Sequence, residues 1–563
     1  MSLREPQSAA MGMLLAAAAG DALGWPQELR GGLVGGKKAR SSIEPKPRFV
    51  SWVRNAGSRF SGVYKDRVRA GEYSDDTQPI CAVARACSQS EEWFDWLTTV
   101  ELPTWRIYQR GGGASTLRAA SSWSERRPPW RSSGSTKTQE SVGRYWEAGG
   151  NGAAMRIAPH VLLTPFDEQE LMRRVVLDSV ATHGHPRAIL GATTYAAALR
   201  HAYMTDRTVE YGDMIRASKV GLIPTVAVRS WFPSDYFEDG SAHDFFGEWE
   251  RTIVQLSQML DQASDALDRG SMSNDEDFLR EIGALGLSGG AGTSTAVAAI
   301  YLASRAAARP LSGLLSAAFM RDADTDTIAS MCGALLGAIH GESWLGELAL
   351  VQDADYLRSL ALELVVNRGR HRRWPSQSPP SLVRRLNEDL LRPTPRSQGE
   401  FPDGREYSIE ALETLDGSRE YRRSYLRLDD GQLVLIDKRG SGSGRDETVP
   451  FDDRRTDPPA VRRGHARITL FTNDVGRLAS FYSRLLDVEL VVSSKEFLFE
   501  GIRVAKVDRD IATNRDLAVD VFVANVDRVA LLFNGEIDRT NGELRTRIVD
   551  PDGRLVRVSS LPG

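Results

Sequence analysis

The stretch Arg321-Asp322-Ala323-Asp324-Thr325-Asp326-Thr327 runs directly into the small-residue sequence Ile328-Ala-Ser-Met-Cys-Gly-Ala-Leu-Leu-Gly-Ala-Ile339. This arrangement predicts a helix that begins at a cluster of carboxylate and hydroxyl oxygens. A similar cluster, Ser74-Asp75-Asp76-Thr77, lies far earlier in the chain and precedes a second small-residue helix, Gln78 to Cys87. Asp and Thr oxygens are ligands of hard cations such as Mg²⁺ and Mn²⁺. Two such clusters at two helix starts predict one carboxylate-rich metal site.

Each cluster alone is also typical of an ordinary helix N-terminus. Ser, Thr and Asp are preferred N-cap residues, and acidic side chains suit the positive end of a helix dipole. A cap needs one such side chain, however. Adjacent Asp75 and Asp76 repel each other, and Asp324 and Asp326 would do so if both faced one way. The surplus of negative charge therefore favours a cation, while a simple cap stays the alternative for either cluster.

Composition narrows the class of protein. The length of 563 residues allows about three or four domains. A net charge of -4 gives no overall field that would hold nucleic acid or an anionic membrane. The apolar run Met11–Ala19 is too short to span a bilayer. The three cysteines, Cys81, Cys87 and Cys332, have no zinc-site spacing and indicate buried thiols in a reducing compartment. We therefore expect a cytoplasmic protein with no membrane contact.

The pattern along the chain divides it into parts. The predicted organisation is an all-α domain over residues 1–370, a Pro- and Arg-rich linker over 371–400, a small β-rich segment over 401–460 and an α+β domain over 464–563. Within the first part we expect the first helix to span 8–24, residues 30–70 to be mostly loop, and 105–148 to form a long binding loop rich in Trp, Arg and Gly. Within the last part, a β-α-β pattern that recurs predicts an internal duplication of a βαβββ unit.

Five motifs of residues 1–345 together resemble the ADP-ribosylglycohydrolase family, which includes the dinitrogenase reductase-activating glycohydrolases. They are Gly20-Asp-Ala-Leu-Gly24 with Glu28, Ser74-Asp-Asp-Thr77, Gly150-Asn-Gly-Ala-Ala-Met-Arg156, Thr182-His-Gly-His-Pro186 and Asp324-Thr-Asp-Thr327. The resemblance implies a fold of orthogonally packed helices with a binuclear Mg²⁺ (or Mn²⁺) centre. It implies hydrolysis of the glycosidic bond between ADP-ribose and an acceptor.

The resemblance also implies roles for individual residues. By motif position the metal ligands would be Ser74, Asp75, Asp76, Asp324, Asp326 and Thr327. Two positions depart from the family pattern. Ser74 replaces the usual Thr but keeps its hydroxyl oxygen. Asp322-Ala323 replace the usual Gly-Gly, which could alter the approach of the backbone to metal or substrate.

Cleavage of a ribosyl bond needs a water placed on the anomeric carbon, which two Mg²⁺ ions can orient, and a carboxylate base. Glu28 is one candidate base, and a metal-bound carboxylate, Asp76 or Asp326, is the other. An exposed loop acid is the alternative interpretation of Glu28.

Substrate contacts are expected at three places. The turn Gly150-Asn151-Gly152-Ala153 offers backbone N–H groups for the diphosphate, although a plain Gly-rich turn has the same sequence. His183 and His185 are candidates for contact with phosphate or ribose, and packed polar residues are an equal alternative. Trp105, Trp123, Trp130 and Trp146 are candidates for stacking on adenine, with core packing as the default.

The last hundred residues resemble a glyoxalase-like (vicinal oxygen chelate) domain. The similar pieces are His465-Ala-Arg-Ile-Thr-Leu470, Phe481-Tyr-Ser-Arg-Leu-Leu486 and Asp550-Pro-Asp-Gly553. Active members carry a His on the first strand and a Glu on the last as metal ligands. His465 keeps the first, but Arg557 stands at the acidic position, and a cation there opposes a metal. We therefore expect this domain to mediate ligand binding or dimerisation.

Three functions follow as hypotheses. The first is a Mg²⁺-dependent hydrolase that releases ADP-ribose from an ADP-ribosylated protein or small molecule. The second is a non-catalytic ADP-ribose-binding or structural member of the same fold, but such a protein would be expected to lose acids that this chain retains. The third is a hydrolase of a free ADP-ribose derivative. The acceptor, whether arginine, serine, nucleic acid or a small molecule, would lie outside all five motifs.

Overall fold

The computed structural model describes the greater part of the chain, in segments. They are residues 5–28, 45–58, 62–89, 92–205, 209–238, 244–286, 289–366, 372–392, 394–417 and 421–439, and the strands of the C-terminal region between 468 and 560. The chain divides into two compact units, Met1–Pro458 and Pro459–Gly563, which are described separately. None of the described helices combines the length and the hydropathy that a membrane span requires.

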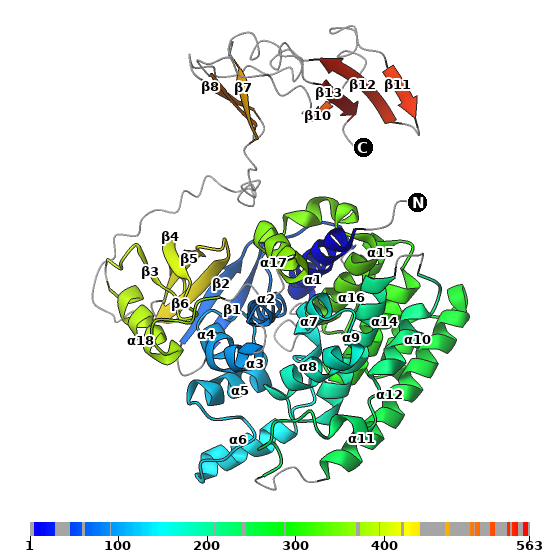
Figure 1. Ribbon diagram of the computed structural model, residues 1–563, viewed down its shortest axis with the longest axis vertical. Helices are drawn as coiled ribbons and strands as arrows, with labels where there is room; N and C mark the ends of the chain where they lie inside the picture. Colours follow the sequence, from blue (N-terminus) through cyan, green and yellow to red (C-terminus); the bar gives the residue numbers. More distant parts are fainter. Residues whose placement is uncertain are drawn as a thin grey trace. The chain divides into compact units, whose positions relative to one another are not determined.

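The first unit is mostly helical, as expected for residues 1–370 (Figure 1). Its α-helices are α1 (Pro6–Glu28), α2 (Thr77–Cys87), α3 (Trp93–Trp96), α4 (Leu102–Trp105), α5 (Ala114–Ser124), α6 (Thr136–Trp146), α7 (Ala158–Leu163), α8 (Glu168–Val180), α9 (Pro186–Met204), α10 (Asp213–Ser218), α11 (Thr225–Val228), α12 (Phe245–Asp268), α13 (Asp275–Glu281), α14 (Gly292–Arg305), α15 (Pro310–Ala318), α16 (Thr325–His340), α17 (Ala354–Val366) and α18 (Pro379–Leu390). Short π and 3₁₀ segments are η3 (Leu97–Glu101), η4 (Ala154–Arg156), η5 (Lys219–Gly221), η6 (Gly270–Met272) and η7 (Ser343–Leu350).

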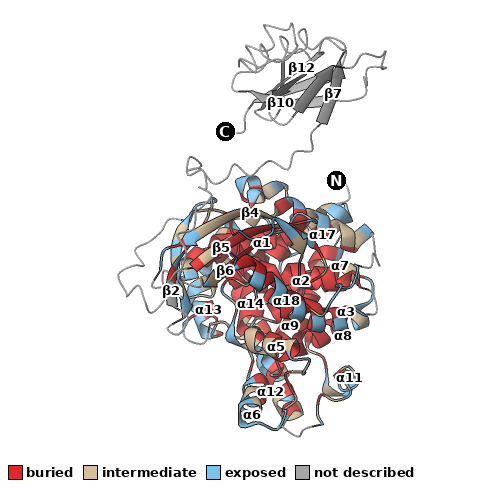
Figure 2. Cartoon of the chain, turned by 90° about the vertical axis from the view of Figure 1, so that its left-hand side faces the viewer, coloured by how far each residue is buried: buried red, intermediate tan, exposed pale blue. Residues whose placement is uncertain are grey.

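Helices α1 and α16 form the centre of this unit and pack with their backbones in contact. Small residues recur at every fourth position on both helices, in antiparallel order: Gly12, Ala16, Gly20 and Gly24 of α1 against Gly337, Gly333, Ala329 and Thr325 of α16. A Cβ on Gly20 would lie 2.2 Å from the carbonyl oxygen of Ala329, so only glycine permits this approach. Buried residues concentrate in the helices around this pair, including α2, α9 and α14 (Figure 2). All three cysteines are buried and free, as predicted.

Strands lie on one side of these helices (Figure 1). They are β1 (Trp52–Ser58), β2 (Gly62–Val68), β3 (Gln398–Glu400), β4 (Glu406–Leu415), β5 (Tyr421–Leu428) and β6 (Leu433–Arg439). Strands β1 and β2 pair as an antiparallel hairpin, and β3 to β6 form an antiparallel sheet in sequence order. The hairpin contacts the sheet where the N–H of Lys65 donates to the carbonyl oxygen of Asp416 (2.7 Å). The β-rich character predicted for 401–460 is therefore present in its described part, and this sheet belongs to the same compact unit as the helices.

Four local expectations were wrong. Helix α1 does not end at Gly24 but continues through Pro26 to Glu28. Packing offsets the hydrogen bond that Pro26 removes, since Trp25 is buried in an edge-to-face contact with Trp52 at 5.3 Å. Residues 52–58 and 62–68 pair as antiparallel strands where loop was expected, and 379–390 form helix α18 inside the expected linker.

The fourth concerns the expected binding loop over 105–148, half of which is helical in α5 and α6. Its tryptophans serve the core: Trp105, Trp123 and Trp130 are buried, and Trp146 packs against Tyr236 at 4.9 Å. These contacts correspond to the default core packing rather than to stacking on adenine.

The second unit contains two sheets. One has strand order β7-β9-β8, with β7 (Ile468–Thr472), β8 (Glu496–Phe499) and β9 (Ile502–Lys506). The other has order β10-β13-β12-β11, with β10 (Ala518–Val523), β11 (Ile537–Thr540), β12 (Glu543–Val549) and β13 (Leu555–Ser560). In the first sheet β7 runs parallel to β9, and β9 runs antiparallel to β8. In the second sheet β10 runs parallel to β13, and β13 runs antiparallel to β12. This repeated topology is what a duplication would produce. His465 and the two helices predicted in this unit lie outside the described residues.

Candidate metal and substrate site

Three segments far apart in the sequence meet at one acidic cluster. Asp21 lies on the buried face of α1, Ser74 to Asp76 form the turn before α2, and Asp324 to Thr327 begin α16. Asp21 fixes the turn, because it accepts hydrogen bonds from the N–H of Ser74 (3.0 Å), the N–H of Thr77 (2.9 Å) and the Thr77 hydroxyl (2.6 Å). The sequence interpretation gave Asp21 no role. The available signal was a single acid inside an otherwise apolar helix, a costly residue to bury.

The two predicted clusters are in direct contact. The Thr327 hydroxyl donates to Asp76 Oδ2 at 3.2 Å, and the Ser74 hydroxyl lies 3.5 Å from the same oxygen. Carboxylate oxygens of Asp21, Asp76 and Asp326 all lie within 4.8 Å of one another, as do those of Glu28, Asp324 and Asp326. Asp326 therefore joins the two groups. Asp75 belongs to neither group of three and lies beside Gly111.

The electrostatics of the cluster are those of crowded, poorly solvated acids. Burial raises the pKa of Asp76 well above its usual value, and Asp21 and Asp75 raise it further. Burial and then Glu28 do the same to the pKa of Asp326. Burial and then Asp21 raise the pKa of Asp75 to about 7. Partial desolvation and the charge of Asp324 also raise the pKa of Glu28 to about 7, although Glu28 keeps solvent contact at the rim.

One atom of this cluster tests whether a cation fits. Asp76 Oδ1 is buried and has no hydrogen-bond partner within the described residues. A buried carboxylate oxygen without a donor is unfavourable by about 1–3 kcal/mol or more. A hard divalent cation would satisfy that oxygen and neutralise its neighbours, and the donors present are the carboxylates and hydroxyls that such cations prefer. The residues therefore fit a metal ion. Helix capping explains only part of the cluster: Asp21 and Asp326 accept N–H groups at the starts of α2 and α16, but neither Asp76 nor Asp324 makes a side-chain cap hydrogen bond.

The predicted Gly-rich turn borders this cluster. The Asn151 amide donates to Asp324 Oδ2 at 2.8 Å, and the Asn151 N–H donates to the carbonyl oxygen of Gly290 at 3.0 Å. Gly150 forms a β-bridge with Ala291, just before α14. A ligand that binds at the acids would therefore also contact this turn. The Asn151 N–H is already committed, which leaves the other amides of the turn as the candidate donors.

Comparison with known proteins agrees with the motifs. Residues 3–373 match the family model of ADP-ribosylglycohydrolases. This chain belongs to the ADP-ribosylglycohydrolase family. Among solved structures, a chain described as "ADP-ribosylglycohydrolase-related protein complex" is 20% identical, with 66% of this chain and 100% of that chain covered and a TM-score of 0.39. A search of curated proteins found no match. The family match ends at residue 373, and no comparison supports a glyoxalase-like domain over 464–563.

Family membership gives the acidic cluster its context. It supports a hydrolase that acts on ADP-ribosyl compounds, and the carboxylate groups described above are capable of holding metal. The five motifs that carried the resemblance lie within the matched residues.

The two predicted histidines lie close to the turn with different surroundings. His183 is buried under Gly152, where an added Cβ would lie 2.9 Å from His183 Cε1. Burial and then the charge of Arg156 lower the pKa of His183 to about 3, so its ring is neutral. His185 is the N-cap of α9, accepts from the N–H of Arg187 and has its pKa lowered to about 4 by burial and then by Arg187. Packing and capping thus account for both side chains.

Proposed function

We propose that this chain is a metal-dependent hydrolase that cleaves the glycosidic bond between ADP-ribose and an acceptor and releases ADP-ribose. The observation that carries the proposal is the buried, unpartnered Asp76 Oδ1 inside a cluster of acids from three segments. A set of like charges in that position is unfavourable unless a cation joins it. The family match supplies the class of substrate.

The proposed metal ligands are the side chains of Ser74, Asp75, Asp76, Asp324, Asp326 and Thr327, and the proposed cofactor is two Mg²⁺ or Mn²⁺ ions. When bound, such ions orient ribose hydroxyls and lower the pKa of a bound water. Asp21 is a positioning residue in this scheme. Its oxygens are occupied by the Ser74–Thr77 turn, and they hold that turn against the start of α16.

Glu28 is the proposed general base. Its pKa of about 7 matches the value at which a base is half-ionised near neutral pH, and its solvent contact lets it reach a water. In the reaction the water oxygen bonds to the anomeric carbon while Glu28 takes one proton of the water. The bond from that carbon to the acceptor breaks, and the acceptor leaves with the electron pair and receives that proton from Glu28. The amides of Gly150, Gly152 and Ala153 are the proposed diphosphate donors, and Asn151 holds Asp324 in place. His183 supports this turn from below, and His185 fixes the start of α9 beside it.

The region beyond residue 464 enters the proposal as a separate glyoxalase-like module for ligand binding or dimerisation. Its duplicated strand topology supports the duplication predicted for it. The proposed domain limits are 1–370 for the catalytic part and 464–563 for this module, with the sheet β3–β6 packed in the first unit.

The test is an assay of ADP-ribose release. The full chain is incubated with ADP-ribosylated arginine, an ADP-ribosylated serine peptide and ADP-ribosylated nucleic acid, each with Mg²⁺ or with EDTA. We expect release with Mg²⁺ only, and its loss in Asp76→Ala and Asp326→Ala. Asp355→Ala, an exposed acid on α17, is the matched control and should retain full activity. Release that persists in EDTA would refute the metal role, and ADP-ribose binding without release from any substrate would favour a non-catalytic member of the family.

A further inference from the structure

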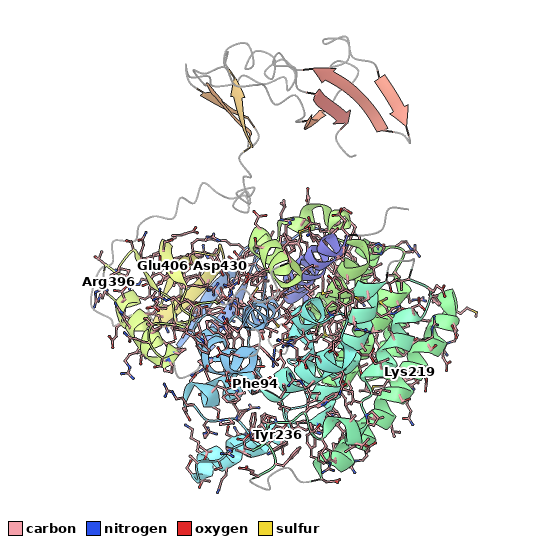
Figure 3. All side chains as sticks on the ribbon, viewed as in Figure 1. Phe94, Lys219, Tyr236, Arg396, Glu406 and Asp430 are labelled. Carbon is pink, nitrogen blue, oxygen red and sulfur yellow. The ribbon has the colours of Figure 1, made fainter. Side chains whose placement is uncertain are left out.

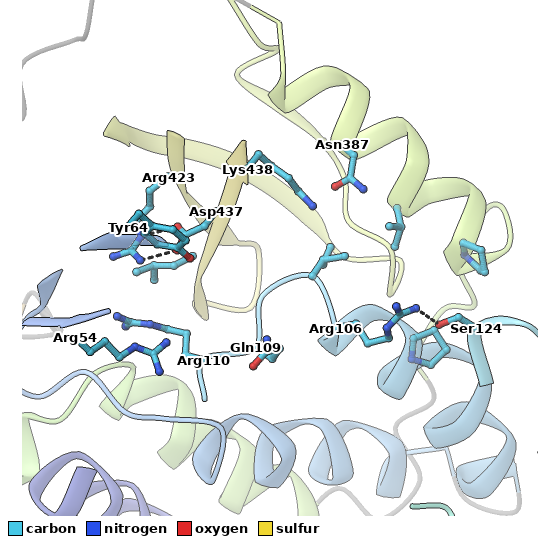
Figure 4. Close-up of a pocket in the computed structure, with 15 residues that line it drawn as sticks. Arg54, Tyr64, Arg106, Gln109, Arg110, Ser124, Asn387, Arg423, Asp437 and Lys438 are labelled. Atoms are coloured by element: carbon cyan, nitrogen blue, oxygen red, sulfur yellow. Dashed lines mark hydrogen bonds and ion pairs between the residues drawn. The ribbon is translucent and has the colours of Figure 1, made fainter. Parts of the chain in front are cut away.

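A second cavity lies beside the acidic cluster: the carbonyl oxygen of Arg110, one of its wall residues, accepts a hydrogen bond from the N–H of Asp75 at 3.1 Å. It has a volume of about 460 Å³, which is within the range of pockets that hold small molecules. Its walls come from α4, the hairpin β1–β2, α18 and strands β5 and β6 (Figure 4). The last three of these elements lie beyond residue 373, where the family match ends. None of the acids proposed as metal ligands lines this cavity.

The cavity wall is strongly cationic. Five basic side chains line it against one carboxylate, Asp437; the five are Arg54, Arg106, Arg110, Arg423 and Lys438. Three of the arginines are already paired. Arg54, Arg110 and Arg423 all contact the buried Asp66, at 2.7, 3.0 and 2.7 Å. Arg423 also pairs with Asp437 (2.7 Å), and Arg110 pairs with Glu72 (2.6 Å). Three acids thus balance three arginines.

Two cations of the wall remain without an acid. The Arg106 guanidinium donates to the Ser124 hydroxyl at 3.0 Å, and within the described residues it forms no ion pair. The Lys438 ammonium has no hydrogen bond or ion pair in the described part of the chain. Burial lowers its pKa, and the nearby charge of Asp437 offsets this only in part. Figure 4 shows Lys438 on β6 and Asn387 on α18 reaching toward Arg106 and Gln109 across the cavity.

Polar atoms without partners also belong to this wall. Arg423 is only 1% exposed, and its Nη1 has no hydrogen-bond partner in the described chain although its other nitrogens are paired. Arg110 Nε is likewise buried without a hydrogen-bond partner in the described chain. Buried guanidinium nitrogens and ammonium groups without acceptors are unfavourable, and an anion supplies the acceptors. The surplus of two positive charges corresponds to the charge of a phosphate dianion.

We propose that this cavity binds a small molecule of nucleotide size that carries a phosphate or diphosphate group. Arginine presents planar sets of N–H donors that match phosphate oxygens, which favours phosphate over a single carboxylate. The remaining wall includes the apolar side chains of Pro103, Ile107 and Val383, which suit the uncharged part of such a ligand. The cavity neighbours the proposed hydrolytic site through Arg110 but is lined by none of its proposed ligands, and the inference does not depend on the hydrolase activity.

The experiment is isothermal titration calorimetry of the full chain in EDTA with pyrophosphate, AMP and ADP. Lys438→Gln and Arg106→Gln remove the two unpaired charges without touching the Asp66 ion pairs. We expect each variant to bind at least about tenfold more weakly. Lys219→Gln is the matched control, since Lys219 pairs with Asp261 on the exposed far side of the helices (Figure 3) and should bind within about twofold of the unmodified chain.

The three probes distinguish the source of the phosphate. Pyrophosphate that binds as tightly as ADP would mean that the phosphates alone are recognised, whereas tighter ADP would mean that the apolar wall takes a nucleoside; both outcomes support the site. Two results would overturn it: no saturable binding of any probe at millimolar concentration, or binding that both variants leave unchanged while circular dichroism shows them folded.

Discussion

The unusual pKa of Asp75 gives a prediction that separates a metal site from a set of structural acids. Burial and the charge of Asp21 raise the pKa of Asp75 from 3.8 to about 7. Between these two values the unfolded chain has lost the Asp75 proton and the folded protein has kept it. The contribution of Asp75 to stability is therefore full below pH 3.8 and is lost as pH rises toward 7. Without metal, the ionised side chain destabilises the fold at neutral pH.

The magnitude follows from linkage. From pH 5 to 7 the folded protein holds one more proton than the unfolded chain, which lowers the free energy of unfolding by roughly 2.7 kcal/mol over these two pH units. The partial solvent contact of Asp75 reduces this change to about 2 kcal/mol. The whole-protein profile does not report this value directly. The raised pKa of Glu28 acts in the same direction as that of Asp75, and the lowered pKa values of His183 and His185 act in the opposite direction between pH 5 and 6.5. The informative quantity is the difference between the unmodified chain and Asp75→Asn, in which the histidine contributions cancel.

The assay is urea unfolding in EDTA at several pH values from 5 to 8, followed by tryptophan fluorescence. We expect the free energy of unfolding of the unmodified chain to fall by about 2 kcal/mol relative to that of Asp75→Asn across this range. The control Asp355→Asn should show the same pH dependence as the unmodified chain. Added Mg²⁺ should stabilise the unmodified chain more as pH rises, because metal binding requires ionised carboxylates. A difference between the unmodified chain and Asp75→Asn that stays flat from pH 5 to 8 would refute the electrostatic argument, and a Mg²⁺ effect independent of pH would refute the link to metal.

Other substitutions test the remaining parts of the argument. Glu28→Gln should lower kcat by about 10²- to 10⁴-fold and remove a rise of kcat/KM with pH centred near 7, with Mg²⁺ binding retained in calorimetry; near-normal kcat would exclude Glu28 as the base. Gly337→Ala should destabilise the fold by about 3 kcal/mol or fail to fold, because its Cβ would lie 2.1 Å from a backbone oxygen of α1. Gly143→Ala on α6 is the control: its Cβ meets nothing within 4 Å, and thermal unfolding should show no loss and a gain of up to about 1 kcal/mol from helix propensity. Gly152→Ala should raise KM for the ADP-ribosyl substrate several-fold, since its Cβ would lie 2.9 Å from the His183 ring and displace the turn; an unchanged KM would place the diphosphate elsewhere.

The helices around the site were predictable because their signals are local. Helices α2 and α16 begin and end within a few residues of the predicted limits. The hairpin β1–β2 escaped prediction because its buried face reads Tyr64, Asp66, Val68. Asp66 is buried only because three arginines from separate segments surround it. Because the arginines that pair with Asp66 are distant in sequence, the local sequence of this strand resembles that of a polar loop.

The meeting of the Ser74–Asp76 and Asp324–Thr327 clusters was also predictable, because each places surplus acids at a helix start. Asp21 was not, since its role is to accept hydrogen bonds from the backbone of a turn fifty residues later. The cationic cavity was beyond prediction for a similar reason. Its wall joins Arg106 to Lys438, and nothing in either local sequence indicates the other.

The register of α1 against α16 explains how the fold and the site depend on each other. A Cβ on Gly24 would lie 2.2 Å from the carbonyl oxygen of Thr325, and the Thr325 hydroxyl donates to the carbonyl oxygen of Gly24 at 2.9 Å. Glu28 lies one helical turn beyond Gly24, and Asp324 and Asp326 flank Thr325. The same close contact that builds the core therefore sets the separation of Glu28 from the two acids. Because α1 continues through Pro26, this separation is held by a packed helix rather than by a loop, and the proposed base and the proposed metal ligands are positioned before any substrate binds.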